Sequence, residues 1–301
     1  MTPVATRVVL VGGHESDDGA DLLRFEELVP RAVAVRPGCW LHDVAMAALD
    51  NGETVVAVPM TFGRDPTMVA DTARTLRWVT DRWGGAVALA APFGVADHLT
   101  ARLRAVAGAA QSRDPEAALL VAARAGSAFD DAELHRIVHL VRVHGAAGEV
   151  AVATLGPDAT TGIATAVDRL RRLGFQRSLV VSAGFTADLP AADGATPAGP
   201  LMGDAAVARI VSERVAAALH DLGHGRDGIG AGLAADHDHG FAHSHDHPHP
   251  HEHPHEHSHA HDQLLPAAPG PDQQGRFRWS AGSHRTTTAP TTSRSTPAAP
   301  R

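Results

Sequence analysis

Short runs of consecutive apolar residues alternate with longer stretches of helical periodicity through the first 230 residues. Nearly continuous apolar runs are typical of strands buried on both faces of a parallel sheet, whereas apolar residues recurring every three or four positions are typical of helices. The pattern predicts strands at residues 7–11, 54–59, 86–90, 118–122, 149–154 and 178–182. It predicts helices at residues 68–81, 95–107, 131–144, 161–173 and 205–222. This alternation favours a doubly wound α/β architecture.

The two halves of this region follow a similar order. RVVLVGGHES in the first half and ALLVAARAGS in the second each lead from a strand through a turn of small residues into a helix. Each half continues with a Gly-terminated helix and a buried strand. The pattern indicates a duplicated unit, although generic βα units could produce the same order by coincidence. We predict an α/β fold of two similar doubly wound parallel-sheet halves, residues 1–112 and 113–231.

Aliphatic residues become scarce beyond residue 231, where histidine and then proline, serine, threonine and alanine dominate. Such a composition buries too little apolar surface to offset the entropy of ordering the chain. We predict that residues 232–301 form a disordered tail, rich first in histidine and then in Pro, Ser and Thr.

The tail contains a histidine-rich segment, HDHGFAHSHDHPHPHEHPHEHSHAHD, in which most histidines stand at every second position. Neutral imidazole coordinates divalent transition metals such as Co²⁺, Fe²⁺, Ni²⁺ or Zn²⁺, and interspersed carboxylates add oxygen ligands. Prolines exclude a continuous helix, so the segment predicts several exchangeable metal sites suited to storage or transfer. The alternative is a low-complexity tail with incidental affinity. The predicted ligands are His237, His239, His243, His245, His247, His249, His251, His253, His255, His257, His259 and His261.

Composition excludes several classes of function. The formal charge of −8 argues against nucleic acid as a partner, and no apolar run approaches a membrane span. The N-terminal sequence lacks the features of a secretory signal, which favours a cytoplasmic location. The single cysteine, Cys39, cannot form an internal disulfide or hold an iron–sulfur cluster alone, and its apolar flanks suggest a buried, inert thiol. The oligomeric state stays open.

Three common enzyme motifs are missing. VGGHES is not the GxGxxG of dinucleotide-binding folds, and the GxSxG of hydrolases does not occur. A P-loop requires a lysine, and this chain has none. Every basic side chain other than histidine is an arginine, which pairs bidentately with carboxylates.

Four segments resemble the sirohydrochlorin cobalt and iron chelatases, and one of them, VAARAGSAFDDAEL, is similar to a turn of their two-repeat forms. VLVGGHES is similar to the strand and turn that carry that family's first histidine, and VVAVPMTFGRDPTMVADT is similar to its second motif, with Pro59 and Asp71 in register. ATPAGPLMGDAAVARIVSERVAAAL resembles the closing segment. The resemblance covers about residues 5–222, and it implies a lyase that inserts Co²⁺ or Fe²⁺ into a tetrapyrrole in cobalamin or sirohaem biosynthesis.

The resemblance also implies roles for individual residues. His14 stands where the family has a histidine that binds metal or accepts pyrrole protons, although a turn histidine can also be purely structural. Arg124, in VAARAGS, occupies the corresponding place in the second half, and the two turns carry Ser16 and Ser127. We assign Ser16, Ser127, Arg64 and Arg124 to binding of the tetrapyrrole, whose carboxylates arginine would clamp.

Several positions depart from the family pattern. The second metal-binding histidine falls at Thr67, and AVAVRPGCW lacks the expected acidic residue. His42 could replace either ligand, but on a helix it more often packs or is solvated. Asp65 and Asp71 could supply oxygens, although Asp65 before proline is more simply a helix-start signal.

The leading hypothesis is therefore a sirohydrochlorin chelatase-like enzyme with a histidine-rich metal reservoir. A non-catalytic metal-storage protein or metallochaperone on a degenerate chelatase fold is the first alternative. A regulatory domain that binds a tetrapyrrole without metal insertion is the second. The missing ligands favour the alternatives, and the order of the motifs favours the enzyme.

Overall fold

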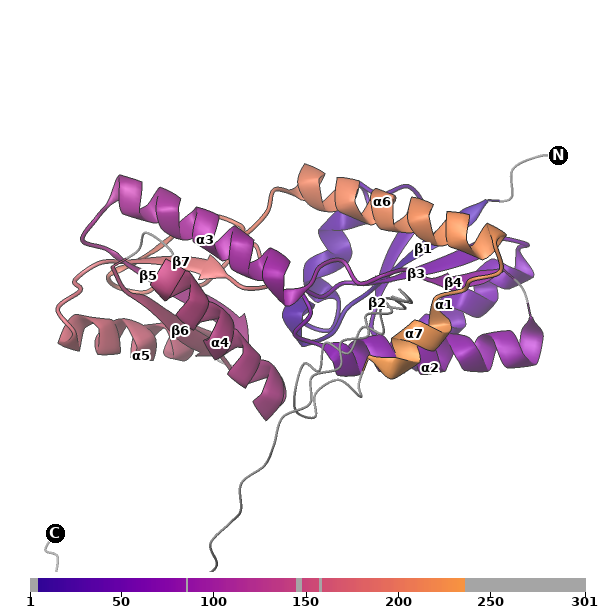
Figure 1. The fold of residues 1–301 in the computed structure, drawn as a ribbon, viewed down its shortest axis with the longest axis horizontal. Coiled ribbons are helices and arrows are strands. Elements are labelled where there is room, and N and C mark those ends of the chain that lie inside the picture. Colours follow the sequence, from indigo (N-terminus) through magenta and orange to yellow (C-terminus); the bar gives the residue numbers. More distant parts are fainter. Residues whose placement is uncertain (1–4, 85, 145–147, 157–158, 236–301) are drawn as a thin grey trace, which may run out of the picture. The chain divides into compact units, whose positions relative to one another are not determined.

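A computed structural model describes residues 5–84, 86–144, 148–156 and 159–235 (Figure 1). These residues build two four-stranded sheets in which all paired strands are parallel, flanked by helices. The predicted α/β class with parallel sheets is confirmed. The first sheet contains β1 (Thr6–Val11), β2 (Ala32–Val35), β3 (Thr54–Pro59) and β4 (Val87–Leu89). The second contains β5 (Ala118–Arg124), β6 (Val150–Leu155), β7 (Ser178–Ser182) and β8 (Ala195–Pro197).

The strand order is the same in both sheets. The first sheet runs β2-β1-β3-β4 and the second β6-β5-β7-β8, so the first strand of each half is central. All six predicted strands are present. The strands missing from the prediction are β2, whose apolar run AVAV is only four residues long and half-buried, and β8, whose sequence ATP contains no such run.

The five predicted helices begin within three residues of their predicted starts, but the helix predicted to end at residue 107 extends to Arg113. Asp65 caps α2 by accepting a hydrogen bond from the Met68 backbone N–H at 3.0 Å, and Pro66 occupies its first turn, as the sequence predicted. The α-helices are α1 (Cys39–Asp50), α2 (Pro66–Trp83), α3 (Ala96–Arg113), α4 (Ala128–His144), α5 (Ala159–Arg172), α6 (Asp204–Gly223) and α7 (Ile229–Ala234). Two 3₁₀ helices, η1 (His14–Ser16) and η2 (Ala20–Phe25), follow β1.

The two halves exchange helices. Helix α3 follows the first sheet in sequence but packs against α4 beside the second sheet (Figure 1). Helix α6 follows the second sheet but packs against β3 and β4 of the first. Each exchanged helix presents buried apolar residues to its host sheet, Leu99 and Leu103 from α3 and Val207 and Val211 from α6.

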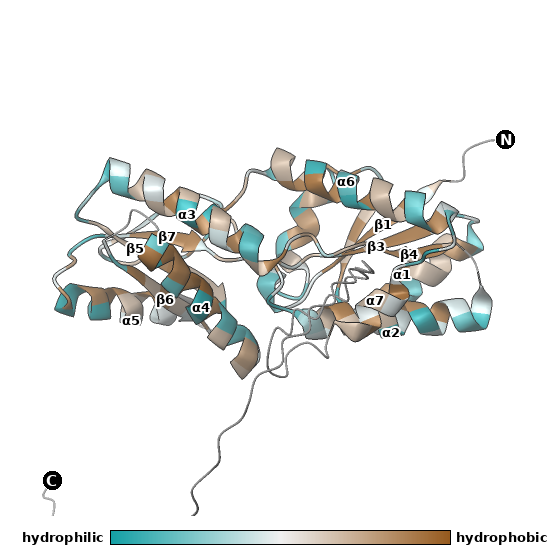
Figure 2. Ribbon diagram, in the orientation of Figure 1, coloured by the Kyte–Doolittle hydropathy of each residue, from teal (hydrophilic) through white to brown (hydrophobic). Residues whose placement is uncertain are grey.

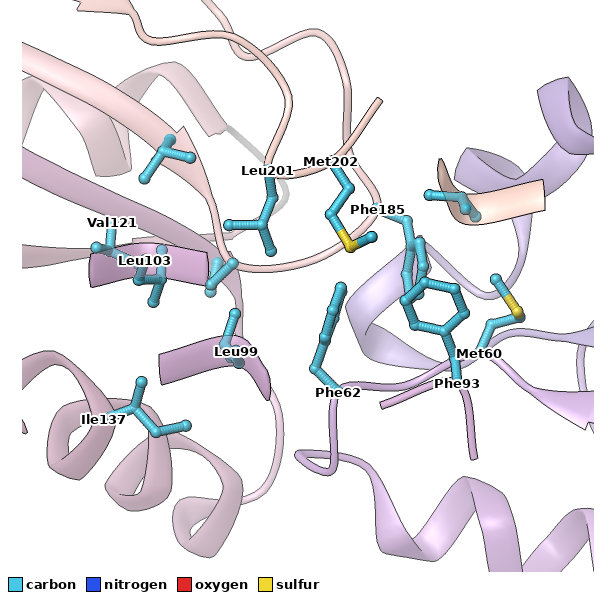
Figure 3. Close-up of a cluster of buried hydrophobic side chains, with 14 of the residues drawn as sticks. Met60, Phe62, Phe93, Leu99, Leu103, Val121, Ile137, Phe185, Leu201 and Met202 are labelled. Carbon is cyan, nitrogen blue, oxygen red and sulfur yellow. The ribbon is translucent and has the colours of Figure 1, made fainter. Parts of the chain in front are cut away.

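A single apolar cluster consequently runs through both halves. It joins Leu10 of β1 to Val121 of β5 by way of three phenylalanine rings at the junction, Phe62, Phe93 and Phe185 (Figure 3). The central strands are hydrophobic along their length, and the helices carry hydrophilic residues on other faces (Figure 2). Burial of this apolar surface stabilises the packing of the two halves against each other.

Polar contacts also join the halves at the carboxyl ends of β1 and β7. The Phe185 backbone N–H donates to the Glu15 carbonyl at 3.0 Å, and Arg24 donates to the Phe185 carbonyl at 2.8 Å. The Thr186 hydroxyl donates to Asp21 at 2.7 Å. Turns from the two halves are thereby held against each other where a ligand crevice in a parallel sheet normally lies.

The division into halves at residue 112 and the start of the tail after residue 231 stay predictions. The exchanged helices pack across that division, since α3 lies beside the second sheet and α6 beside the first. Gly232 to Ala234, which we assigned to the tail, belong to helix α7, where Ile229 is buried and Gly232 contacts α2. Within the part of the chain that the structure describes, no helix is long and apolar enough to cross a membrane.

Candidate functional site

The turn after β1 brings His14 beside the start of α2. Gly13 precedes it, and a Cβ added to Gly13 would lie 2.0 Å from Asp65 Oδ2, so only glycine permits this approach. The backbone N–H of His14 donates to Asp65 Oδ2 at 2.9 Å. The ring Nδ1 lies 3.0 Å from the same oxygen. Both groups of His14 therefore bind one carboxylate, which fixes the ring orientation.

The other ring nitrogen of His14 faces the second half. Nε2 is buried and has no hydrogen-bond partner. A Cβ added to Gly126, just after β5, would lie 2.9 Å from His14 Nε2 and 3.0 Å from Asp130 Oδ2. Both atoms thus border one small space that stays open because residue 126 has no side chain. Asp130 is 6% exposed, and its Oδ2 also accepts from the Ser127 backbone N–H at 2.8 Å.

The electrostatics favour a charged pair between His14 and Asp65. Burial, the largest influence on the pKa of His14, favours the neutral ring. The Asp65 hydrogen bond and the charges of Asp65 and Glu15 outweigh it and raise the pKa of His14 above 6.5. Burial also opposes ionisation of Asp65, but the hydrogen bond and charge of His14 lower the pKa of that carboxyl below 3.8.

Glu15 connects the turn that carries His14 to the loop after β3. Its side chain is buried, and its carboxylate accepts from the Phe62 backbone N–H at 3.1 Å, from the Arg64 backbone N–H at 3.1 Å and from the Thr61 hydroxyl. Burial raises the pKa of Glu15 above 4.5, although the nearby Arg64 charge acts against the shift. These contacts tie the turn after β1 to the loop after β3.

A cavity of about 510 Å³ opens above His14 and is lined by both halves. Its lining is acidic. Arg36 is its only arginine among the described residues, and Thr67 and Ser127 supply hydroxyls. The carboxylates of the lining belong to Asp18, Asp65, Asp71 and Asp130. An acidic cavity around an unpartnered imidazole nitrogen suits a metal cation.

Of the four residues that we assigned to tetrapyrrole binding, one lines the cavity and three do not. Ser16 is fully buried and donates to the Gly13 carbonyl at 3.2 Å, so it shapes the turn. Arg64 is 1% exposed, does not line the cavity, and keeps Nε and Nη2 without hydrogen-bond partners. Arg124 forms an ion pair with Asp17, with 3.0 Å between Nη2 and Oδ2. Only Ser127 lines the cavity, where its hydroxyl accepts from the Asp130 backbone N–H at 3.2 Å.

The other candidates separate into two groups. Thr67 and Asp71 line the cavity with His14. His42 does not, since its ring packs 4.8 Å from that of Trp78, in line with the packing interpretation. The expectation that Cys39 is buried was wrong, because it begins α1 with its side chain exposed while Leu41 and Ala45 form the buried face.

The predicted ligands from His237 to His261 lie outside the described residues. Within the described ranges, no group of three or more His, Cys, Asp or Glu side chains is arranged to hold a metal ion. The described part of the site therefore offers two donor atoms that border one space, His14 Nε2 and Asp130 Oδ2.

Two residues of this site were missed in the sequence. Glu15 adjoins His14 in HES, but its burial depends on the loop after β3. Asp130 begins the second half's helix, where an acidic residue usually indicates only a favourable first turn. The signal that could have found Asp130 is its place: GSAFDD follows β5 as GHES follows β1.

No protein-family model matches the sequence, and a search of curated proteins gives no match. Two solved structures are similar to the chain: SirB from Bacillus subtilis with Fe³⁺, at TM-score 0.47, and the sirohydrochlorin chelatase SirB from Bacillus subtilis subspecies spizizenii in complex with cobalt, at TM-score 0.43. Each alignment has 12% sequence identity and covers 74% of this chain, with 99% and 98% of the respective neighbour. Similarity at this level does not establish a shared function or shared site residues.

Proposed function

We propose that this chain binds a divalent transition metal ion at Nε2 of His14 and inserts it into a tetrapyrrole of the sirohydrochlorin type held in the same cavity. The observation that carries the proposal is the state of the His14 ring. Asp65 holds Nδ1, while Nε2 is buried, has no partner and borders a space shared with Asp130. A carboxylate on the far nitrogen of a metal-binding imidazole fixes its tautomer and increases its basicity.

The small number of protein donors suits transfer better than permanent binding. His14 and Asp130 supply two donors, so a bound ion keeps positions free for nitrogen atoms of an incoming ligand. Metal insertion releases two pyrrole protons, and a nearby base must accept them. Asp18 lines the cavity and would accept them, whereas Asp71, also in the lining, is paired with Arg74.

The histidine-rich segment would act as the reservoir. It starts at His237, two residues after the last described residue, Ala235. Ala235 follows helix α7, which packs against α2, the helix whose capping residue holds His14. The connection keeps stored metal at a raised effective concentration near the cavity. Imidazole sites bind Ni²⁺, Cu²⁺ and Zn²⁺ more tightly than Co²⁺, so delivery of cobalt depends on which metal is supplied.

The test is metal insertion by the purified full-length chain. Mixed with sirohydrochlorin and Co²⁺, the chain should accelerate the absorbance change of insertion above a protein-free blank. His14→Ala should abolish the acceleration, whereas His135→Ala, at an exposed position on α4, should preserve it. An inactive wild-type chain, or full activity in His14→Ala, would refute the catalytic proposal.

A metal store or metallochaperone is the second candidate, and the charge of the cavity favours it. Asp65 is paired with His14 and Asp71 with Arg74, which leaves the carboxylates of Asp18 and Asp130 against Arg36 in the cavity lining. This balance repels the carboxylates of a tetrapyrrole. Arg64 and Arg124, which we expected to clamp them, are buried or paired with Asp17.

The two candidates respond differently when serine replaces all twelve histidines from His237 to His261 in a full-length chain, called here the tail-substituted chain. A chelatase should keep its turnover with added metal. A store should lose most of its bound metal per chain and show no turnover before or after the substitution.

A further inference from the structure

A second cavity, of about 490 Å³, is separate from the cavity at His14. Residues of α3 and α6, the two exchanged helices, line it together with the loops after β3 and β4. No residue lines both cavities. Phe62 stands between them, because its backbone N–H binds Glu15 on the His14 side while its ring lines the second cavity.

The inner wall of the second cavity is apolar and firmly packed. The Phe62 ring lies 5.2 Å from that of Phe93 at a steep angle and stacks 5.1 Å from that of Phe185 (Figure 3). Met202 and Ile210 complete the apolar lining. Such a wall favours a ligand with an apolar ring or chain, since binding removes apolar surface from water.

Arginine side chains also line this cavity. Arg214 keeps its Nε buried without a hydrogen-bond partner, while its Nη2 donates weakly to the Phe93 carbonyl at 3.4 Å. Arg102 lines the cavity from an exposed position on α3. The acidic residue of the lining, Glu213, already accepts from Arg209 at 2.7 Å. An anionic ligand in the cavity would form charge-assisted hydrogen bonds with the guanidinium groups of Arg102 and Arg214.

His98 adds a further donor. Its Nδ1 accepts from the Val95 backbone N–H at 3.3 Å, so the neutral ring carries its proton on Nε2. The cavity thus combines an apolar wall with several donors.

We infer that this cavity binds an amphipathic organic anion, an apolar ring system or short alkyl chain that carries one carboxylate or sulfonate. The apolar part lies against Phe62 and Phe93, and the anionic group faces Arg102 and Arg214. This site is independent of the metal proposal, because none of its residues binds the ion at His14.

The first experiment titrates the full-length chain with 8-anilinonaphthalene-1-sulfonate and follows its fluorescence. Binding should saturate at one probe per chain. Ala105→Trp, which fills the cavity from an exposed position on α3, should weaken binding at least tenfold. Ala109→Trp is the matched control, because Ala109 is exposed one turn further along the same helix and does not line the cavity.

The second experiment tests the anionic part. Octanoate should displace the probe at a concentration at least tenfold lower than 1-octanol, which has the same chain length without the charge. Arg102→Gln should reduce this preference, whereas Arg104→Gln, exposed on the same helix outside the lining, should leave it unchanged. His14→Ala should bind the probe as the wild type does.

Equal probe binding in Ala105→Trp and Ala109→Trp would overturn the site. Equal displacement by octanoate and octanol would overturn its preference for anions. Loss of probe binding in His14→Ala would overturn its independence from the metal site.

Discussion

His14 contacts a single oxygen of Asp65 through both its backbone N–H and its ring Nδ1, although the two residues are 51 positions apart. The same carboxylate caps α2 through its other oxygen. One side chain thus positions a helix and a candidate metal ligand together. The orientation of His14 Nε2 depends on this contact.

Asp65→Asn should weaken metal binding at His14 while preserving the helix start. Asparagine caps helices as well as aspartate does, but it removes the negative charge that raises the pKa of His14. We expect the pKa of His14 to fall and the affinity for Co²⁺ to fall about 10- to 100-fold in the tail-substituted chain. Histidine NMR titration and calorimetry measure the two effects. Asp168→Asn, exposed on α5 and outside the lining of the cavity, should change neither.

Gly126→Ala should block the metal site without removing a ligand. The new methyl group would lie 2.8 Å from Asp130 Cβ and 2.9 Å from His14 Nε2. We expect the tail-substituted chain to lose at least tenfold in Co²⁺ affinity. Gly156→Ala is the matched control, since Gly156 follows β6 and a Cβ there meets nothing within 4 Å. Equal affinities in the two variants would mean that the space beside Gly126 does not hold the ion.

The free energy of unfolding of the metal-free chain should depend on the His14–Asp65 pair in a defined pH window. The raised pKa of His14 gives stability that is complete below 6.5 and is lost as the pH rises through the raised value. The lowered pKa of Asp65 gives stability that is present above 3.8 and is lost as the pH falls through the lowered value. Urea unfolding with chelator present should therefore show the largest difference between wild type and His14→Gln near about pH 5, and a smaller one at about pH 9.

Glu15→Ala should destabilise the chain strongly. It leaves two buried backbone N–H groups and the Thr61 hydroxyl without their acceptor. Each stranded donor costs about 1–3 kcal/mol, so we expect a loss of more than about 3 kcal/mol in urea unfolding. Glu15→Gln keeps one acceptor oxygen and should cost much less. Glu116→Ala, at an exposed position, should have little effect.

Local pattern was sufficient to predict the sheets but not the exchange of helices between them. Continuous apolar runs located six strands within about two residues, and the Asp-Pro pair located the start of α2. Nothing local in α3 indicates that Leu99 and Leu103 pack beside the second sheet, because an apolar helix face fits either partner. The apolar run of β2, AVAV, is only four residues long and half-buried, so it did not stand out as a strand.

The candidate site was predicted only in part for a similar reason. His14 stood out by its place after β1, whereas Glu15 and Asp130 depend on loops distant in sequence. Arg64 is a residue type that could bind the carboxylates of a ligand, but its side chain is buried and does not line the cavity. Side-chain burial is decided by packing between segments, so residue type and spacing alone do not fix it.

A crystal structure of the tail-substituted chain soaked with Co²⁺, with anomalous diffraction at the cobalt edge, would locate the ion relative to His14. We expect one strong anomalous peak about 2.1 Å from His14 Nε2, on the side of Gly126 and Asp130, and no such peak in His14→Ala. A chain that binds Co²⁺ only elsewhere, or that keeps this peak without the His14 ring, would show that His14 is not the metal ligand.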